Sequence, residues 1–291
     1  MSPQAHRAGF AAILGPPNSG KSTLLNRLLG EKLAIVSRKP QTTRSRILGI
    51  LSRDDAQLLF LDTPGFHASP KAFNETLNDQ VVEAAQGCDV ALLLVDLCSG
   101  WSEGHADLKS RLSSAGKPVI VVGSKLDLPG AKDGSWPPPQ ADRALRVSAL
   151  TGEGLPKLLS TVVELLPESP PLYPRDEISD RPLRFLVAEL VREAAFEVLS
   201  QELPYSLAVE VVDFDESRPD LTRIRAELLV ERNSQKPIVV GRGGTSIRKI
   251  GTRARREIER LVDGRVHLEL WVKVEPRWSR SAARIRGLGY N

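Results

Sequence analysis

The segment from Gly15 to Ser22 holds the residues with the clearest potential for chemistry. Its sequence, GPPNSGKS, fits the phosphate-binding pattern G-x-x-x-x-G-K-[S/T]. The N–H groups of such a loop point inward, and the N-terminus of the following helix favours negative charge. Lys21 is expected to reach the β- and γ-phosphates of a nucleotide, and Ser22 to ligate Mg²⁺. The predicted phosphate-loop contacts are Gly15, Pro16, Pro17, Asn18, Ser19, Gly20, Lys21, Ser22 and Thr23.

Apolar runs and helix-like spacings alternate around this loop. A strand, the loop and then a helix is the setting that phosphate binding requires. Continued alternation predicts an open, mostly parallel α/β sheet with helices on both faces and the ligand at the carboxyl ends of the strands. Strands are expected at 9–14, 47–53, 56–61, 89–96, 117–124 and 145–149, and helices at 23–29, 81–85, 104–115 and 155–166.

Two short motifs lie at the spacing expected for a nucleotide switch. The tetrapeptide DTPG at 62–65 follows a predicted strand, and QTTR at 41–44 lies in the polar loop before it. With these motifs the chain resembles the translation-factor-like class of GTPases. The resemblance implies that Asp62 holds Mg²⁺ through water, that Thr43 closes on the same ion, and that the Gly65 N–H meets the γ-phosphate of GTP. The implied switch contacts are Thr43, Asp62, Thr63, Pro64 and Gly65.

The tetrapeptide SKLD at 124–127 stands where this class carries N-K-x-D. Asp127 would accept hydrogen bonds from two N–H groups of guanine that adenine cannot offer together, and a wrong base would leave the carboxylate unpaired. Lys125 would lie along the base. Ser124 replaces the asparagine, and because its hydroxyl cannot reproduce two amide contacts, we expect weaker nucleotide affinity. The loop is completed by Ser148, Ala149 and Leu150.

The residues that would drive hydrolysis depart from the small-GTPase pattern. Phe66 follows the DTPG motif where many small GTPases place a water-orienting Gln, so slow intrinsic hydrolysis or outside help is expected. Asn18 resembles an asparagine that holds K⁺ beside the phosphates in some bacterial relatives; the alternative is a loop-stabilising Asx turn. The predicted catalytic residues are Asn18, Lys21, Thr43 and Gly65.

The composition is that of a globular protein with two domains. The chain has 291 residues, of which 41% are hydrophobic and 26% charged. Residues 1–9 lack the apolar core of a signal peptide, and the most apolar run, 90–97, contains Asp96 and is too short to cross a bilayer. We therefore expect a cytoplasmic protein. Two cysteines are too few for a disulfide framework or a zinc site.

A proline-rich stretch divides the chain into unequally charged parts. Residues 167–182 contain five prolines and should form an extended, semi-rigid linker. Residues 182–291 hold 20 Lys and Arg against 16 Asp and Glu, whereas the rest is balanced, and 236–260 hold eight basic and two acidic residues. A basic focus predicts a polyanionic partner. The predicted parts are a P-loop domain at 1–168, a linker at 169–182, a second domain at 183–276 and a basic tail at 277–291.

The second half follows the order α-β-β-α-α-β, with Gly-Arg-Gly-Gly at 241–244 between the last two helices. It thereby resembles a type II KH domain, an α+β fold that binds single-stranded RNA. The resemblance implies that the glycines let the backbone approach the RNA and that four bases lie against an aliphatic wall. The implied RNA contacts are Val239, Gly241, Arg242, Gly243, Gly244, Ile247, Arg248 and Lys249. Trp278 and Tyr290 are candidates for stacking on bases, whereas packing in the core or on the surface is favoured for Trp271.

Taken together, the two halves resemble the bacterial ribosome-assembly GTPases that carry a KH domain. The resemblance implies binding to the 3′ end of small-subunit ribosomal RNA, action on the 30S subunit, GTP hydrolysis and peripheral contact with the inner face of the cell membrane, by a monomer. Three other interpretations stay open: an ATP-using P-loop enzyme, an RNA-binding module with a vestigial nucleotide site, and a membrane-surface protein that uses the arginine-rich tail.

Overall fold

A computed structural model describes residues 6–36, 47–63, 87–131, 136–138, 141–199 and 203–290. The described chain divides into two compact units. The first comprises residues 6–34 and 47–180, and the second comprises residues 35–36 and 181–290. Within the described part no helix is long and apolar enough to cross a membrane.

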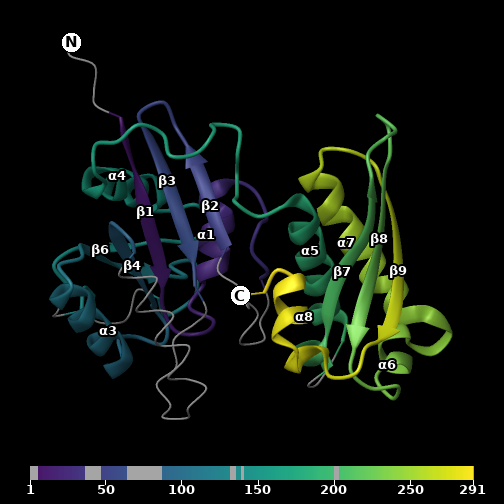
Figure 1. Ribbon diagram of the computed structural model, residues 1–291. Coiled ribbons are helices and arrows are strands. Elements are labelled where there is room, and N and C mark those ends of the chain that lie inside the picture. Colours follow the sequence, from purple (N-terminus) through teal and green to yellow (C-terminus); the bar gives the residue numbers. More distant parts are fainter. Residues whose placement is uncertain are drawn as a thin grey trace. The chain divides into compact units, whose positions relative to one another are not determined.

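The first unit is built on a six-stranded sheet with the strand order β2-β3-β1-β4-β5-β6 (Figure 1). All neighbours are parallel except the β2–β3 hairpin. Its strands are almost continuously apolar because both faces are covered. The predicted open α/β sheet is therefore confirmed. The strands are β1 (Arg7–Leu14), β2 (Ile47–Ser52), β3 (Ala56–Asp62), β4 (Val90–Asp96), β5 (Val119–Ser124) and β6 (Ala144–Arg146).

Three described helices belong to this unit: α1 (Lys21–Leu29), α3 (Glu103–Ser114) and α4 (Leu155–Leu165). Leu108 and Leu112 of α3 pack with Leu14 and Leu93 of the central strands. Helix α1 lies close to β2, since a Cβ added at Gly49 would come within 2.9 Å of side-chain carbons of Leu25 and Leu29.

The last strand is shorter than predicted. Strand β6 ends at Arg146, whereas the sequence pattern placed its end at Ala149. The Ser148 N–H donates to the Glu153 carbonyl oxygen at 3.0 Å, which turns the backbone away from the sheet and forms a tight loop. The helix predicted at 81–85 lies outside the described residues.

The second unit has a three-stranded sheet, β7-β8-β9, in which β7 and β8 are antiparallel and β8 and β9 parallel. Both long helices, α5 and α7, pack against this sheet (Figure 1). The order α-β-β-α-α-β is the predicted KH arrangement. Its elements are α5 (Leu183–Val198), β7 (Ala208–Asp215), β8 (Thr222–Val230), α6 (Lys236–Val240), α7 (Thr245–Leu261) and β9 (Val266–Val274).

Helix α7 is one helix of 17 residues, although the sequence predicts separate helical segments at 245–250 and 252–261. A Cβ added at Gly251 would meet only Leu270, at an ordinary 3.5 Å. The buried face of the helix, formed by Ile250, Ala254 and Ile258, continues through the glycine. Burial of this stripe outweighs the roughly 1 kcal/mol that one glycine costs within a helix.

The C-terminal residues, predicted from the sequence only as a basic tail, fold onto the second unit. They form a 3₁₀ turn (Trp278–Arg280) and α8 (Ala282–Gly287). The Arg284 guanidinium pairs with Glu210 on β7 and with Glu275 just after β9. The Tyr290 hydroxyl lies 3.1 Å from Glu189 Oε1 on α5, beside the fully buried Arg192. Trp278 and Tyr290 are buried, so the idea that they stack on bases is wrong.

Candidate nucleotide and RNA sites

The phosphate loop connects the end of β1 to the start of α1 and has a fixed, left-handed backbone at two positions. Asn18 has φ +61° and Gly20 has φ +94°. A Cβ added at Gly15 would lie 2.7 Å from Ser19 Oγ and 3.0 Å from the Leu94 carbonyl oxygen, so a larger residue would deform the loop. The sequence therefore places its glycines where the chain must bend around a ligand.

Lys21 carries a buried cation at the base of this loop. Its ammonium donates to the carbonyl oxygens of Gly15 and Pro16, each at 2.9 Å. Burial lowers the pKa of Lys21 to about 8, and the nearby Asp62 carboxylate opposes that shift. Ser19 Oγ is also buried and has no hydrogen-bond partner among the described residues. The oxygens of a bound phosphate chain could accept hydrogen bonds from both the Lys21 ammonium and the Ser19 hydroxyl.

The residues beside the loop fit Mg²⁺. Ser22 Oγ donates to Asp62 Oδ2 at 2.8 Å, and this pair joins the start of α1 to the end of β3. Hydroxyl and carboxylate oxygens are the ligands that Mg²⁺ prefers, with water and substrate phosphates completing its shell. Thr63 takes another role, because its hydroxyl donates to the Ile13 carbonyl oxygen at 2.9 Å and ties β3 to β1. Thr43, Pro64 and Gly65 lie outside the described residues, and Thr23 lies in the first turn of α1.

The predicted base-reading loop lies at the carboxyl end of β5. Asp127 is exposed, and its Oδ1 accepts from Ser148 Oγ at 2.6 Å. The Thr151 N–H donates to the same serine hydroxyl at 3.0 Å. Ser148 therefore holds the carboxylate and shapes the following loop, in which Ala149 is partly exposed and Leu150 is 74% exposed.

Ser124 links this loop to the phosphate loop, which the sequence pattern did not predict. Its hydroxyl lies 2.7 Å from the Ser19 carbonyl oxygen and 3.2 Å from the Val95 carbonyl oxygen. The hydroxyl carries one proton and both neighbours are carbonyl oxygens, so it can donate fully to only one of them at a time. That serine does not reproduce two amide contacts, with weaker nucleotide affinity as the result, stays a prediction.

Two supporting residues were not predicted from the sequence. Asp96, the last residue of β4, accepts from the Lys125 ammonium at 2.7 Å and so orients a lysine whose backbone is left-handed, with φ +62°. His105 Nε2 lies 3.1 Å from the carbonyl oxygen of Leu94, the same oxygen that faces Gly15. An acidic residue at the end of an apolar strand was a usable signal for Asp96; the sequence contained none for His105.

The second unit carries a glycine-rich turn before α7. Gly241, Gly243 and Gly244 all have positive φ, at +77°, +60° and +76°. A Cβ added at Gly243 or Gly244 would meet nothing within 4 Å, so the backbone there is open to a ligand. At Gly241 it would collide with Ser246, which makes that glycine structural.

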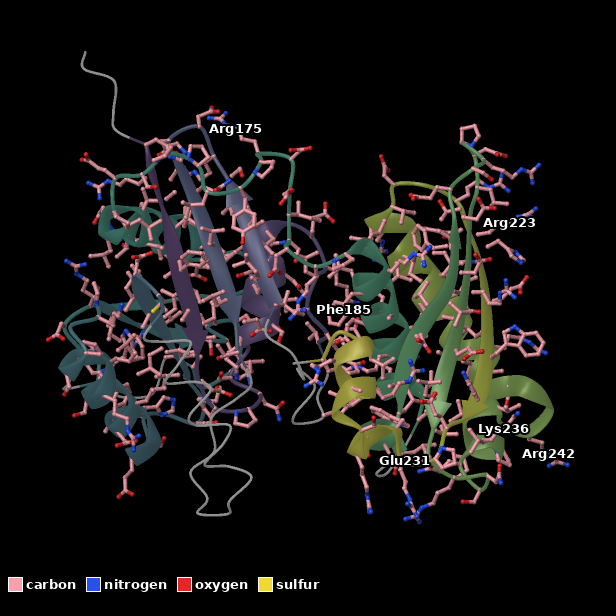
Figure 2. All side chains as sticks on the ribbon, viewed as in Figure 1. Arg175, Phe185, Arg223, Glu231, Lys236 and Arg242 are labelled. Atoms are coloured by element: carbon pink, nitrogen blue, oxygen red, sulfur yellow. The ribbon has the colours of Figure 1, made fainter. Side chains whose placement is uncertain are left out.

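The side chains around this turn divide into exposed cations and an aliphatic group. Arg242, Arg248 and Lys249 are exposed and form no ion pair within the described part of the chain. Figure 2 shows the Arg242 side chain near α6, extending away from the sheet. Unpaired exposed cations beside an open backbone suit a phosphate chain.

The apolar side chains exposed beside the turn differ from those predicted for the aliphatic wall. Val239 is fully buried in the core, so its placement on the wall is wrong, and Ile250 is fully buried as well. Ile247 is partly buried, and Ile238, which the prediction omitted, is 57% exposed on α6. The run Ile-Val-Val gave no indication of which residue faces outward, because α6 has only five residues.

These two sites define a P-loop GTPase domain joined to a KH domain, and comparison with known proteins agrees. A family model described as "50S ribosome-binding GTPase" matches residues 10–125, and one described as "KH domain" matches residues 202–279. GTPase Era of Nitratidesulfovibrio vulgaris strain DP4 is 41% identical over 99% of this chain and 98% of its own length, and that of Geobacter sp. strain M21 is 43% identical over both full lengths.

Two solved structures match at a TM-score of 0.86 and 38% identity, covering 98% of this chain and 99% of theirs. One is Era in complex with MgGDPNP and nucleotides 1506–1542 of 16S ribosomal RNA, and the other is a point variant of Aquifex aeolicus Era bound to GDP.AlF4-. The chain therefore belongs to the Era family of GTPases. This membership removes the ATP-using enzyme from the open interpretations.

The buried Lys21 predicts that nucleotide binding takes up a proton above pH 8. Without phosphate its pKa is about 8, and bound phosphates should restore the charge by raising that pKa. Calorimetric titration with Mg²⁺ and GDP, in buffers of different ionisation enthalpy, should show proton uptake at pH 8.5 that is missing at pH 6.5, where Lys21 is already charged. Equal uptake at both pH values would contradict this assignment.

Asp127→Asn should weaken the discrimination between guanine and adenine nucleotides. The amide keeps the shape but loses one acceptor and the charge, so about 2 kcal/mol, or roughly thirtyfold in selectivity, should disappear. Competition of fluorescent GDP by GDP and by ADP measures it. Asp142→Asn is the matched control, since it removes an exposed carboxylate that pairs with Lys109 at 3.1 Å. Unchanged selectivity in Asp127→Asn would refute the role.

Proposed function

We propose that this GTPase is a nucleotide-controlled RNA-binding protein that acts on small-subunit ribosomal RNA during 30S assembly. The observation that carries the proposal is the presence of two sites in one chain: the buried Lys21 with the Ser22–Asp62 hydrogen bond, and the open Gly243–Gly244 turn among exposed cations. A relative that matches nearly the whole chain binds both MgGDPNP and the 3′ region of 16S ribosomal RNA.

In the proposed nucleotide site, Lys21 and the loop N–H groups hold the phosphates, and Asp127 selects guanine. Ser22 and Asp62, with Thr43, would hold Mg²⁺, which neutralises charge that develops on the phosphates. Asp62 ends β3 and is followed by Thr63, Pro64 and Gly65, so loss of the γ-phosphate would release the segment that begins there. Phe66 provides no group to orient water, so intrinsic hydrolysis should be slow.

In the proposed RNA site, the backbone around Gly243 and Gly244 approaches the sugar–phosphate chain, and Arg242, Arg248 and Lys249 add charge. Ile247 and Ile238 supply the apolar surface on which bases would rest. GTP would favour the arrangement in which this surface is accessible. By linkage, RNA would then tighten GTP binding by the same factor.

We place the protein in the cytoplasm as a monomer. Peripheral contact with the cell membrane would depend on Arg277, Arg280 and Arg286, which remain exposed after the tail folds; Arg284 is held by two glutamates. The burial of Trp278 and Tyr290 removes the aromatic side chains that would anchor this segment in an interface. RNA is therefore the partner that the second unit favours.

Gly243→Asp should weaken binding of an oligoribonucleotide with the sequence of the 16S 3′ end by at least tenfold. The left-handed turn accepts either aspartate or asparagine, and a new side chain has free space there, so the added charge repels phosphate without disturbing the fold. Gly243→Asn, of the same shape but neutral, is the matched control. Fluorescence anisotropy at two salt concentrations measures both variants. Equal affinity of parent and Gly243→Asp would exclude this site.

Hydrolysis should depend on K⁺ through Asn18. We expect faster turnover in KCl than in NaCl at equal ionic strength, because a K⁺ held beside the phosphates supplies positive charge to the transition state. Asn18→Gly should remove the difference while keeping the left-handed backbone, φ +61°, that an asparagine or glycine adopts easily. Identical parent rates in the two salts would leave the Asn18 amide with a role in loop conformation alone.

A further inference from the structure

The proline-rich segment after α4 is attached to the first unit along much of its length. At its start, the Ser169 N–H donates to the His6 carbonyl oxygen at 3.0 Å, and His6 Nδ1 lies 2.8 Å from the Ser169 carbonyl oxygen. The sequence predicted an extended spacer here. Its described residues instead follow the edge of the sheet as far as Asp180, where the first unit ends.

Gln57 of β3 holds the middle of this segment. Its side chain is buried and uses both of its polar ends. Oε1 accepts from the N–H groups of Leu172 and Tyr173 at 2.7 and 2.9 Å, and Nε2 donates to the Tyr173 carbonyl oxygen at 2.8 Å and to Ser52 Oγ at 3.0 Å. The Gln57 amide thus bonds both N–H groups and one carbonyl oxygen of the backbone at 172–173 and fixes this part of the segment against β3.

The following residues continue along the free edge of β2. The Ile50 N–H donates to the Ile178 carbonyl oxygen at 2.9 Å, Ser179 Oγ donates to the Leu48 carbonyl oxygen at 2.7 Å, and Gly49 and Ser179 form an antiparallel bridge. Arg175, labelled in Figure 2, lies 3.5 Å from Asp54 in the β2–β3 turn, an exposed pair that adds little. The segment therefore covers an edge that would otherwise be open to pairing.

The strand that carries these contacts lies between the two predicted switch motifs. Strand β2 begins at Ile47, three residues after the QTTR motif at 41–44, and β3 ends at Asp62. Tyr173 packs on the cluster that contains Leu48 and Leu61 from these two strands. A displacement of either switch motif that moved the hairpin would move the segment bound to it.

We propose that the edge segment, residues 172–179, transmits the nucleotide state of the first unit to the RNA-binding unit, which begins at Arg181. Its contacts with Gln57, Leu48 and Ile50 make it a reporter of hairpin position, and only Asp180 separates it from the second unit. The inference deepens the proposed function, because it assumes that GTP changes RNA affinity, and it names the residues through which that change passes.

The test compares RNA affinity in two nucleotide states. The measured quantity is the ratio of the RNA Kd with GDP to the RNA Kd with a non-hydrolysable GTP analogue, using the full chain and a 16S 3′-end oligonucleotide. We expect Ser179→Ala to reduce the ratio about fivefold relative to the parent, since it removes one hydrogen bond of about 1 kcal/mol. If the parent ratio is below about five, the ratio of the variant should be one. Gln57→Leu should bring the ratio to one.

The matched control is Ser160→Ala, which removes an exposed hydroxyl on α4 that donates to the Lys157 carbonyl oxygen within the same helix. It should keep the parent ratio. Nucleotide affinity and basal hydrolysis should be unchanged in Ser179→Ala, because its hydroxyl donates to the Leu48 carbonyl oxygen on β2, away from the phosphate loop. Thermal unfolding reports whether each variant is folded. If Gln57→Leu does not fold, Ser179→Ala decides alone.

The outcomes separate the inference from the proposed function. A parent ratio above one that persists in Ser179→Ala, and in Gln57→Leu where that variant folds, would overturn the role of the edge segment while leaving nucleotide-controlled RNA binding intact. A parent ratio of one would overturn the nucleotide control itself, and the inference with it. A ratio that falls in Ser179→Ala but not in Ser160→Ala would support the inference.

Discussion

The first unit depends on holding one ammonium group away from water at the meeting point of parallel strands. Lys21 lies against two carbonyl oxygens of its own loop, with Asp62 near enough to favour its charge. Removing a cation from water is costly, and neutral carbonyl groups compensate for only part of that cost. The lowered pKa of Lys21 expresses this deficit. A polyphosphate beside the ammonium would stabilise its charged form.

The strand register and the hydrogen bonds around the phosphate loop fix the position of that ammonium. The parallel register sets Ile13 beside Asp62 and Asp96 beside Ser124, so that polar residues from β3, β4 and β5 reach one edge of the sheet. Ser22 braces α1 against β3, and Ser124 fastens the base-reading loop to the phosphate loop. Each of these contacts joins two strand ends or a strand end to a helix start.

In the second unit, the cations near the glycine-rich turn are exposed to water, whereas Lys21 of the first unit is buried. Arg242, Arg248 and Lys249 stay in water, where a charge costs little and binds weakly, and their effect on a polyanion comes from number and position. The fixed element there is the backbone, with three glycines in left-handed conformations ahead of a 17-residue helix. Buried Arg192 shows that this unit can enclose a charge, which it pairs with Glu189 at 2.6 Å. The exposed cations near the turn are thus distinct from those used for folding.

Short motifs with fixed spacing were predictable because their chemistry dictates both residue type and location. Glycines, Lys21, Asp62 and Asp127 had to lie at or after strand ends, and the strands of the first unit were found where the apolar runs placed them, except that β6 ends three residues earlier. What failed depends on tertiary register. The outward direction of Ile238 rather than Val239 is set by one turn of helix α6, and the burial of Trp278 depends on how the C-terminal residues fold back. The hydrogen-bonding of His105 to Leu94 follows from packing that no local pattern encodes.

The proline-rich segment shows why composition alone does not distinguish a free linker from a segment that is bound to the edge of a sheet. Four of its prolines, at 167, 170, 171 and 174, keep the chain extended and remove backbone donors, which suits a free spacer and equally suits an outermost strand. Gln57 decides between these two arrangements, because its buried amide needs hydrogen-bond partners and finds them in the backbone of residues 172 and 173. A buried glutamine within an apolar strand is costly without such a partner. The residue that fixes the linker therefore lies more than a hundred positions earlier in the chain, on the hairpin between the predicted switches.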